Sequence, residues 1–121
     1  MANSSKGYRR LDAWQSSMKL VGAVREISRT LPDDDRKKLT KRMQRISATV
    51  PRTLARGFGR GGKEYRQYVL DARESLSELE SQMQAAVRLG YLRADQASAA
   101  GRSARDTASR LNCLAMSLEL S

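Results

Sequence analysis

Apolar residues recur every three or four positions through almost the whole of this 121-residue chain, and only two prolines interrupt them. That spacing puts the apolar side chains on one face of an α-helix, whereas a β-strand needs alternation, which we do not find. The eight glycines are mostly clustered, which is typical of a few long elements separated by turns. The pattern therefore predicts an all-α fold.

Turn signals divide this pattern into four helices. Leu31-Pro32 ends the first, the glycine-rich segment 57–62 ends the second, and Gly90-Tyr91-Leu92 ends the third. The acidic triplet 33–35 opens the second helix, where a carboxylate can cap free N–H groups, and we prefer this interpretation to a metal site. The expected helices span about 9–30, 33–56, 63–90 and 94–118.

Four long helices with short connections predict an antiparallel up-down-up-down four-helix bundle. The bundle is expected to occupy residues 9–121 as one domain, after a mobile N-terminal lead of residues 1–8. We interpret Trp14 and the helically spaced tyrosines as core side chains rather than stacking platforms. Cys113, beside the predicted buried face of the last helix, is expected to be a partly buried and inert thiol.

Each helix has a predicted buried face. In the first helix it is Leu11, Trp14, Met18, Val21, Val24 or Arg25, and Ser28. In the second it is Leu39, Met43, Ile46, Val50 and Leu54. In the third it is Tyr65, Tyr68 or Val69, Ala72, Leu76, Leu79, Met83, and Ala86 or Val87. In the fourth it is Ala97, Ala100 or Gly101, Ala104, Ala108, Leu111, Leu114 or Ala115, and Leu118.

Histidine is absent and cysteine occurs once, which removes the commonest general base and the usual zinc ligands. A nucleophile, a base and an orienting group cannot all be assigned, so we expect no enzyme, no catalytic residue, no metal and no cofactor. A lone cysteine forms no internal disulfide and fits a reducing compartment. Without an apolar leader or a membrane-length apolar segment, the sequence predicts a cytoplasmic protein with no membrane partner.

The glycine segment matches two phosphate-binding patterns. Gly57, Gly59 and Gly62 satisfy G-x-G-x-x-G, and Gly57 with Gly62-Lys63 satisfies G-x-x-x-x-G-K. Both motifs need a preceding strand, whereas a helix is predicted here, and Glu64 stands where a phosphate loop has Ser or Thr. We therefore interpret the segment as an interhelical turn, with an anion-binding turn as the alternative.

The positive charge of the chain is concentrated in one quarter of its length. Residues 36–66 hold eleven of the 23 Lys and Arg residues but one of the 13 acids, so twelve of each remain elsewhere. The whole formal net charge of +10 therefore comes from this segment. Such concentration favours a polyanionic partner.

Arginines and lysines at helical spacing should form a continuous stripe beside the buried face of the second helix. A solvated face usually mixes both signs of charge, whereas arginine forks match phosphate. Binding of RNA or DNA through its backbone is thus the leading hypothesis, and a merely solubilising face is the alternative. The candidate nucleic-acid-binding residues are Lys38, Lys41, Arg42, Arg45, Arg52, Arg56, Arg60 and Lys63.

Several blocks between Leu11 and Leu92 resemble one family, the four-helix bundle proteins encoded in intervening sequences of bacterial large-subunit ribosomal RNA genes. The resembling blocks are Leu11-Asp12-Ala13-Trp14-Gln15, the run from Val50 to Gly61, Glu64-Tyr65, the run from Ala72 to Leu79, and Leu89-Gly90-Tyr91-Leu92. The resemblance implies a four-helix protomer in a homopentameric ring, and it carries no activity over.

The family is similar in fold to the accessory variability determinant proteins of diversity-generating retroelements. Those proteins partner a reverse transcriptase and bind nucleic acid through a basic surface, so the resemblance also implies a polymerase-type protein as an alternative partner. An adaptor that binds an acidic protein surface is therefore the second hypothesis. One departure is Arg56, which stands in this chain where the family has an acid, and it makes the surface more basic.

Overall fold

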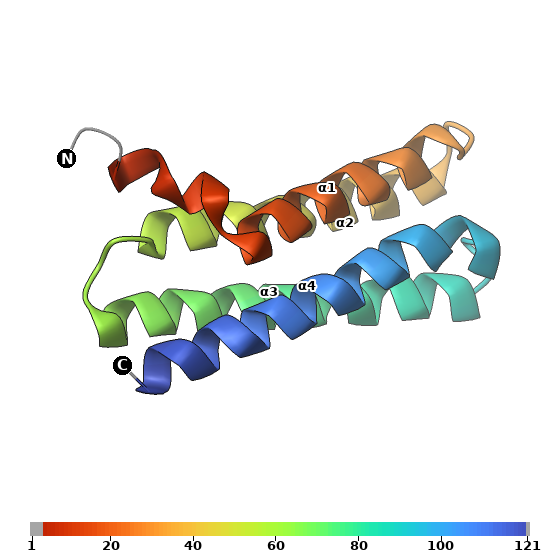
Figure 1. The fold of residues 1–121 in the computed structure, drawn as a ribbon. Helices are drawn as coiled ribbons and strands as arrows, with labels where there is room; N and C mark the ends of the chain where they lie inside the picture. Colours follow the sequence, from red (N-terminus) through yellow and green to blue (C-terminus); the bar gives the residue numbers. More distant parts are fainter. Residues whose placement is uncertain (1–3, 121) are drawn as a thin grey trace.

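The computed structural model describes residues 4–120, and it confirms an all-α chain with four long helices. Figure 1 shows that successive long helices run in opposite directions, so that the end of α4 lies at the same end of the bundle as the start of α1. In chain order the elements are the 3-10 helix η1 (Ser4–Arg10), α1 (Asp12–Arg29), α2 (Asp35–Gly57), α3 (Gly62–Arg88) and α4 (Ala94–Leu120).

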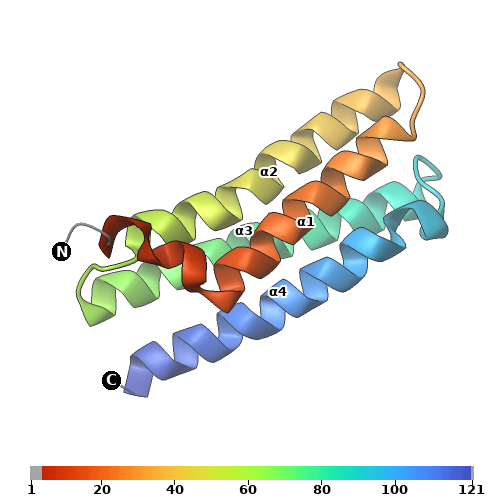
Figure 2. The ribbon, with the colours of Figure 1, turned by 45° about the horizontal axis from the view of Figure 1, so that its top comes forward.

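The four long helices surround one core. α1 contacts α2 and α4, and α3 contacts the same two helices. Figure 2 shows α1 between α2 and α4, with α3 behind it. Within residues 4–120, no helix combines the length and the apolar character that crossing a membrane requires.

The helix ends lie close to the predicted positions. α2 begins after Asp34, whose carboxylate accepts a hydrogen bond from the backbone N–H of Arg36 at 2.9 Å, which confirms the capping interpretation of the acidic triplet. α1 begins at Asp12 rather than near residue 9, because Leu11 is extended (φ −67°, ψ 130°) and separates α1 from η1. Gly90 closes the turn before α4 with φ +82°, which suits glycine.

The 3-10 helix η1 occupies part of the segment that the sequence predicts to be a mobile lead, residues 1–8; residues 1–3 lie outside the described part. η1 contacts both α1 and α2. The ring of Tyr8 meets that of Trp14 edge-on, with centroids 5.5 Å apart. Gly7 lies so close to Phe58, just after α2, that an added Cβ would come within 3.0 Å of the ring. These contacts attach η1 to the α1–α2 pair.

The predicted buried faces of α3 and α4 are largely confirmed. The buried residues of α3 are Tyr65, Val69, Ala72, Leu76, Leu79, Met83 and Ala86. Those of α4 are Ala100, Ala104, Thr107, Ala108, Leu111 and Ala115. The buried side chains of α4 are thus mostly small, whereas those of α3 are mostly large.

The predicted buried face of α1 is wrong by part of a turn. The buried residues are Ala13, Ser16, Ser17, Leu20, Val24 and Ile27. Met18 is instead 43% exposed, Leu11 and Trp14 are half-buried and pack against the core, and Val21 is half-buried. In α2, likewise, Leu39 and Ile46 are half-buried, whereas Thr40 and Ser47 are fully buried.

Buried hydroxyl groups explain this difference. Those of Ser17, Thr40 and Ser47 donate to backbone carbonyls three residues earlier in their own helices, at 2.7, 3.0 and 2.8 Å. Ser16 links α1 to α4, since its Oγ donates to Asp106 at 2.7 Å and lies 2.8 Å from the hydroxyl of Thr107. Because these groups have partners, their burial leaves no unsatisfied polar atom, although a hydrophobic pattern counts them as polar.

The predicted burial of the aromatic side chains is confirmed in part, and that of the cysteine is not. Tyr65 is buried, as predicted for a core side chain, while Tyr68 and Trp14 are half-buried. The prediction for Cys113 is wrong: the thiol is exposed. It lies two residues beyond the buried Leu111, and a helix turns about 200° over two residues, so the side chain faces away from the core.

Candidate functional site

Six of the eight predicted binding residues lie on the outer face of α2. All six are exposed, whereas Met43, Val50 and Leu54 of the same helix are fully buried. Two residues along a helix turn by about 200°, so Arg45 lies nearly opposite Met43, and Arg52 nearly opposite Leu54. We call this set the outer stripe; it comprises Lys38, Lys41, Arg42, Arg45, Arg52 and Arg56.

The sequence analysis predicts a continuous stripe, whereas the outer stripe has two parts. No cation occurs between Arg45 and Arg52, which are seven residues or about 10 Å apart along the helix. Ala48 and Thr49 occupy the gap, and both are half-buried. Lys63, on the first turn of α3 after the glycine turn, is also exposed.

Within residues 4–120, Arg60 is the one predicted site residue that has an acidic partner. Its Nη1 donates to Glu64 at 2.6 Å, its Nε donates to the carbonyl of Arg56 at 3.0 Å, and its guanidinium lies 5.2 Å from the ring centroid of Tyr68. The hydrogen bond to Glu64 raises the pKa of Arg60. The guanidinium is therefore cationic, but its charge is already paired with a carboxylate.

The other seven predicted residues form no ion pair with any residue in the described part of the chain. Two other cations of segment 36–66 do form pairs: Arg36 lies 2.7 Å from Asp34, and Arg66 lies 3.7 Å from Glu119. Unpaired cations also occur on other helices, such as Arg88 and Arg102, but the outer stripe places six of them on one face of one helix, which is a surface suited to a polyanion.

The glycine turn connects α2 with α3. A helix precedes the glycines, as predicted, rather than the strand that a nucleotide motif requires. Gly59 adopts φ +85°, which suits glycine, and the N–H of Arg60 donates to the carbonyl of Gly57 at 3.1 Å. No side chain caps the first turn of α3. An anion at that helix end stays a prediction.

The sequence pattern did not predict an apolar groove beside the outer stripe. Trp14, Met18 and Val21 of α1 face Ala48, Pro51 and Ala55 of α2 across it, Tyr8 lies at its η1 end, and Arg52 and Arg56 of the outer stripe also line it. Its volume is about 510 Å³. We call it the α1–α2 groove. The sequence does contain an indication of this groove, because helix 12–29 has two groups of apolar residues. One group lies in the core, and the other, Trp14, Met18 and Val21, lines the groove.

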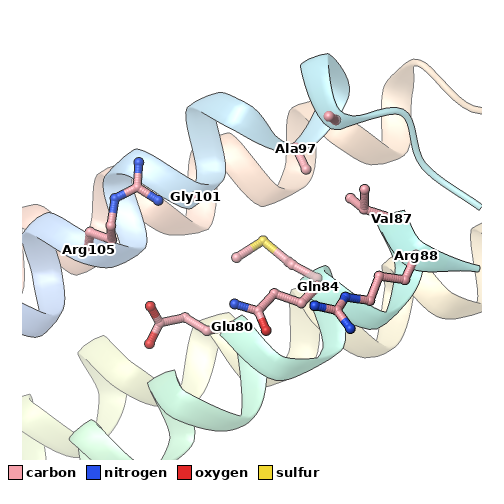
Figure 3. Close-up of a pocket in the computed structure, with 9 residues that line it drawn as sticks. Glu80, Gln84, Val87, Arg88, Ala97, Gly101 and Arg105 are labelled. Atoms are coloured by element: carbon pink, nitrogen blue, oxygen red, sulfur yellow. The ribbon is translucent and has the colours of Figure 1, made fainter.

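A second groove lies between α3 and α4, with a volume of about 380 Å³. Figure 3 shows Glu80 and Gln84 of α3 across from Ala97 and Gly101 of α4, with Arg88 and Arg105 at opposite ends. Glu80 also lies 3.9 Å from Arg73. Because this groove contains a carboxylate and shares no residue with the outer stripe, we do not include it in the candidate site.

The fold and this surface define the class of protein: a four-helix bundle in which six exposed cations without acidic partners among residues 4–120 share the outer face of one helix. The chain matches the family model described as 23S rRNA-intervening sequence protein over residues 9–113. The protein belongs to that family, as the resemblance predicts. A comparison with curated proteins gave no match.

Proposed function

We propose that this protein is a non-enzymatic homo-oligomer that binds the backbone of RNA or DNA through the outer stripe and Lys63. The observation that carries the proposal is the unpaired charge: the six exposed cations on one face of α2, and Lys63 at the start of α3, have no carboxylate partner among residues 4–120. Four of the six stripe residues are arginines, whose planar fork suits phosphate. Release of counterions from the phosphates then drives binding.

Sequence-specific recognition is not part of the proposal. Helix α2 uses its opposite face, with Met43, Val50 and Leu54, to build the core. Lysine and arginine at the surface position a nucleic acid through its phosphates, which are the same for every sequence. The expected ligands are therefore mixed-sequence RNA and DNA.

Assembly into a ring, five subunits by resemblance, would repeat the outer stripe around an axis, so that weak contacts multiply by avidity. Two large apolar side chains near the end of α4 support contact with a second copy. Met116 and Leu120 are one helical turn apart, and 62% and 86% exposed. Apolar side chains grouped at a surface are typical of protein interfaces.

The binding proposal is tested with fluorescence anisotropy of labelled, mixed-sequence RNA and DNA. Arg45→Gln combined with Arg52→Gln should weaken binding at least about tenfold, because two phosphate contacts are lost. The matched control is Arg88→Gln combined with Arg102→Gln, which removes two exposed cations without ion pairs from α3 and α4. The control should bind like the wild type. Absence of binding by the wild type at about 50 mM salt contradicts the proposal.

Two further outcomes have separate meanings. Light scattering should give a mass several times that of the 13.5 kDa subunit, and a single-subunit mass would contradict assembly. If Arg42→Glu with Arg45→Glu abolished capture of an acidic polymerase-type protein but left nucleic-acid affinity unchanged, the stripe would instead serve an adaptor.

A further inference from the structure

The α1–α2 groove contains apolar side chains that the core covers only in part. Met18 is 43% exposed, and Trp14 and Val21 are half-buried. They face Ala48 and Ala55, whose small side chains leave the groove open. A groove of about 510 Å³ is within the usual size of small-molecule sites.

The charges around this groove are all positive. Arg52 and Arg56 line it one helical turn apart, and neither forms an ion pair among the described residues. Arg9 lies 5.9 Å from the ring centroid of Tyr8, at the η1 end. No Asp or Glu lines the groove. An occupant should therefore combine an apolar, planar part with negative charge close beside it.

An unpaired nucleotide has these properties, since its base is flat and its phosphates are adjacent. Aromatic side chains stack with any base, while cations follow the backbone. Trp14 and Tyr8 supply aromatic surface, and their rings are inclined at 67° to each other. Resting on the proposed function, we infer that the α1–α2 groove accepts a base of single-stranded nucleic acid whose phosphates contact Arg52 and Arg56.

A duplex cannot use the groove in the same way. Its bases are paired and stacked, and turning one out costs a few kcal/mol, so a duplex contacts only the outer stripe. A second copy of this chain fits the groove less well, because a subunit of net charge +10 would bring further cations to Arg52 and Arg56. The groove should therefore make the protein bind single strands more tightly than duplexes.

Trp14 makes this inference directly measurable, because it is the chain's one tryptophan and lines the groove. The wild type is titrated at about 50 mM salt with a mixed-sequence single strand and with the corresponding duplex. The single strand should quench Trp14 fluorescence and bind about tenfold more tightly, the gain expected from stacking one base. The duplex should bind without quenching.

Two variants fill the groove without changing its charge. Ala48→Leu and Ala55→Leu, each tested alone, should abolish both the quenching and the tenfold preference, and leave duplex affinity unchanged. Ala99→Leu is the matched control, since Ala99 is exposed on α4 and lines neither groove. It should behave like the wild type in both titrations.

Each remaining outcome overturns a stated claim. Equal affinity for single strand and duplex, with no quenching, overturns the inference but leaves the proposed function standing. Failure of both to bind overturns the proposed function. If the filling variants keep single-strand binding but lower the mass in light scattering, the groove is a contact between subunits and the inference is wrong.

Discussion

Of the two glycines in α2 and α3, Gly57 is the one at which the two helices are in close contact. An added Cβ would lie against Cβ of Tyr68 and 2.7 Å from its Cγ, both of them atoms close to the α3 backbone that cannot easily move. Gly57 is buried and also ends α2. Its lack of a side chain is therefore a requirement of packing.

Gly57→Ala should destabilise the protein by about 1–3 kcal/mol, because the added methyl group forces α2 and α3 apart. Urea unfolding measures this change. Gly22→Ala is the matched control, since Gly22 lies inside α1 with nothing within 4 Å of an added Cβ. That control should instead stabilise the protein by up to about 1 kcal/mol through helix propensity. Equal effects of the two variants would contradict the packing argument.

Asp106 connects the buried hydroxyls to the surface. It accepts hydrogen bonds from Ser16 at 2.7 Å and from Arg110 Nε at 3.1 Å, and these bonds, the one from Ser16 above all, lower its pKa. A lowered carboxyl pKa stabilises the fold above the pKa of the unfolded chain. That stabilisation is lost as the pH falls through the lower pKa of the folded state.

Asp106→Asn should therefore be less stable than the wild type near neutral pH, and this difference should shrink in acid. The free energy of unfolding in urea is compared between about pH 6 and about pH 3 for both proteins. Asp33→Asn is the control, because the exposed Asp33 side chain forms no hydrogen bond or ion pair among the described residues. A difference that stays constant across this pH range would contradict the role of Asp106.

Among the helices, α1 is the one whose rotation about its own axis determines both the core and the α1–α2 groove. Its buried face pairs with α4 through Ser16, Asp106 and Thr107, while its second apolar set lines the α1–α2 groove. One helix thus supplies both the core and a surface groove. The groove exists because α1 is rotated with Leu20 and Val24 inward rather than Met18 and Val21.

This orientation is tested by two truncations of similar size. Leu20→Ala should cost about 2–5 kcal/mol, because Leu20 is fully buried and its loss leaves a cavity. Met18→Ala should cost less than about 1 kcal/mol, because Met18 is 43% exposed and loses little apolar contact. Urea unfolding of both variants gives the answer. The reverse order would mean that the stripe first predicted from the sequence is the buried one.

At the scale of the whole molecule, the charge distribution sets how binding depends on salt. About six phosphate contacts from the outer stripe predict that affinity falls by about a factor of 10³ between about 50 and 200 mM salt. Arg45→Gln with Arg52→Gln should reduce the slope of log affinity against log salt by about 2. Anisotropy across a salt series measures this slope. An unchanged slope would mean that these two arginines do not contact phosphate.

The helical pattern of the sequence is sufficient to predict the all-α fold and the buried face of α3, and its composition locates the charge excess. In α3 one apolar set, from Tyr65 to Ala86, dominates, so the period alone identifies its buried face. The positions of the stripe cations follow from the same period, because their spacing around a helix is geometric.

The packing of the four helices selects which apolar set of α1 is buried and which cations have an acidic partner. Ser16 enters the core because Asp106 and Thr107 of α4 satisfy its hydroxyl, and no local pattern contains that information. Arg60 and Arg56 are both arginines in one basic run, yet only Arg60 reaches a carboxylate, that of Glu64. Periodicity specifies directions around a helix axis, whereas partners depend on which surfaces the other helices bring into contact.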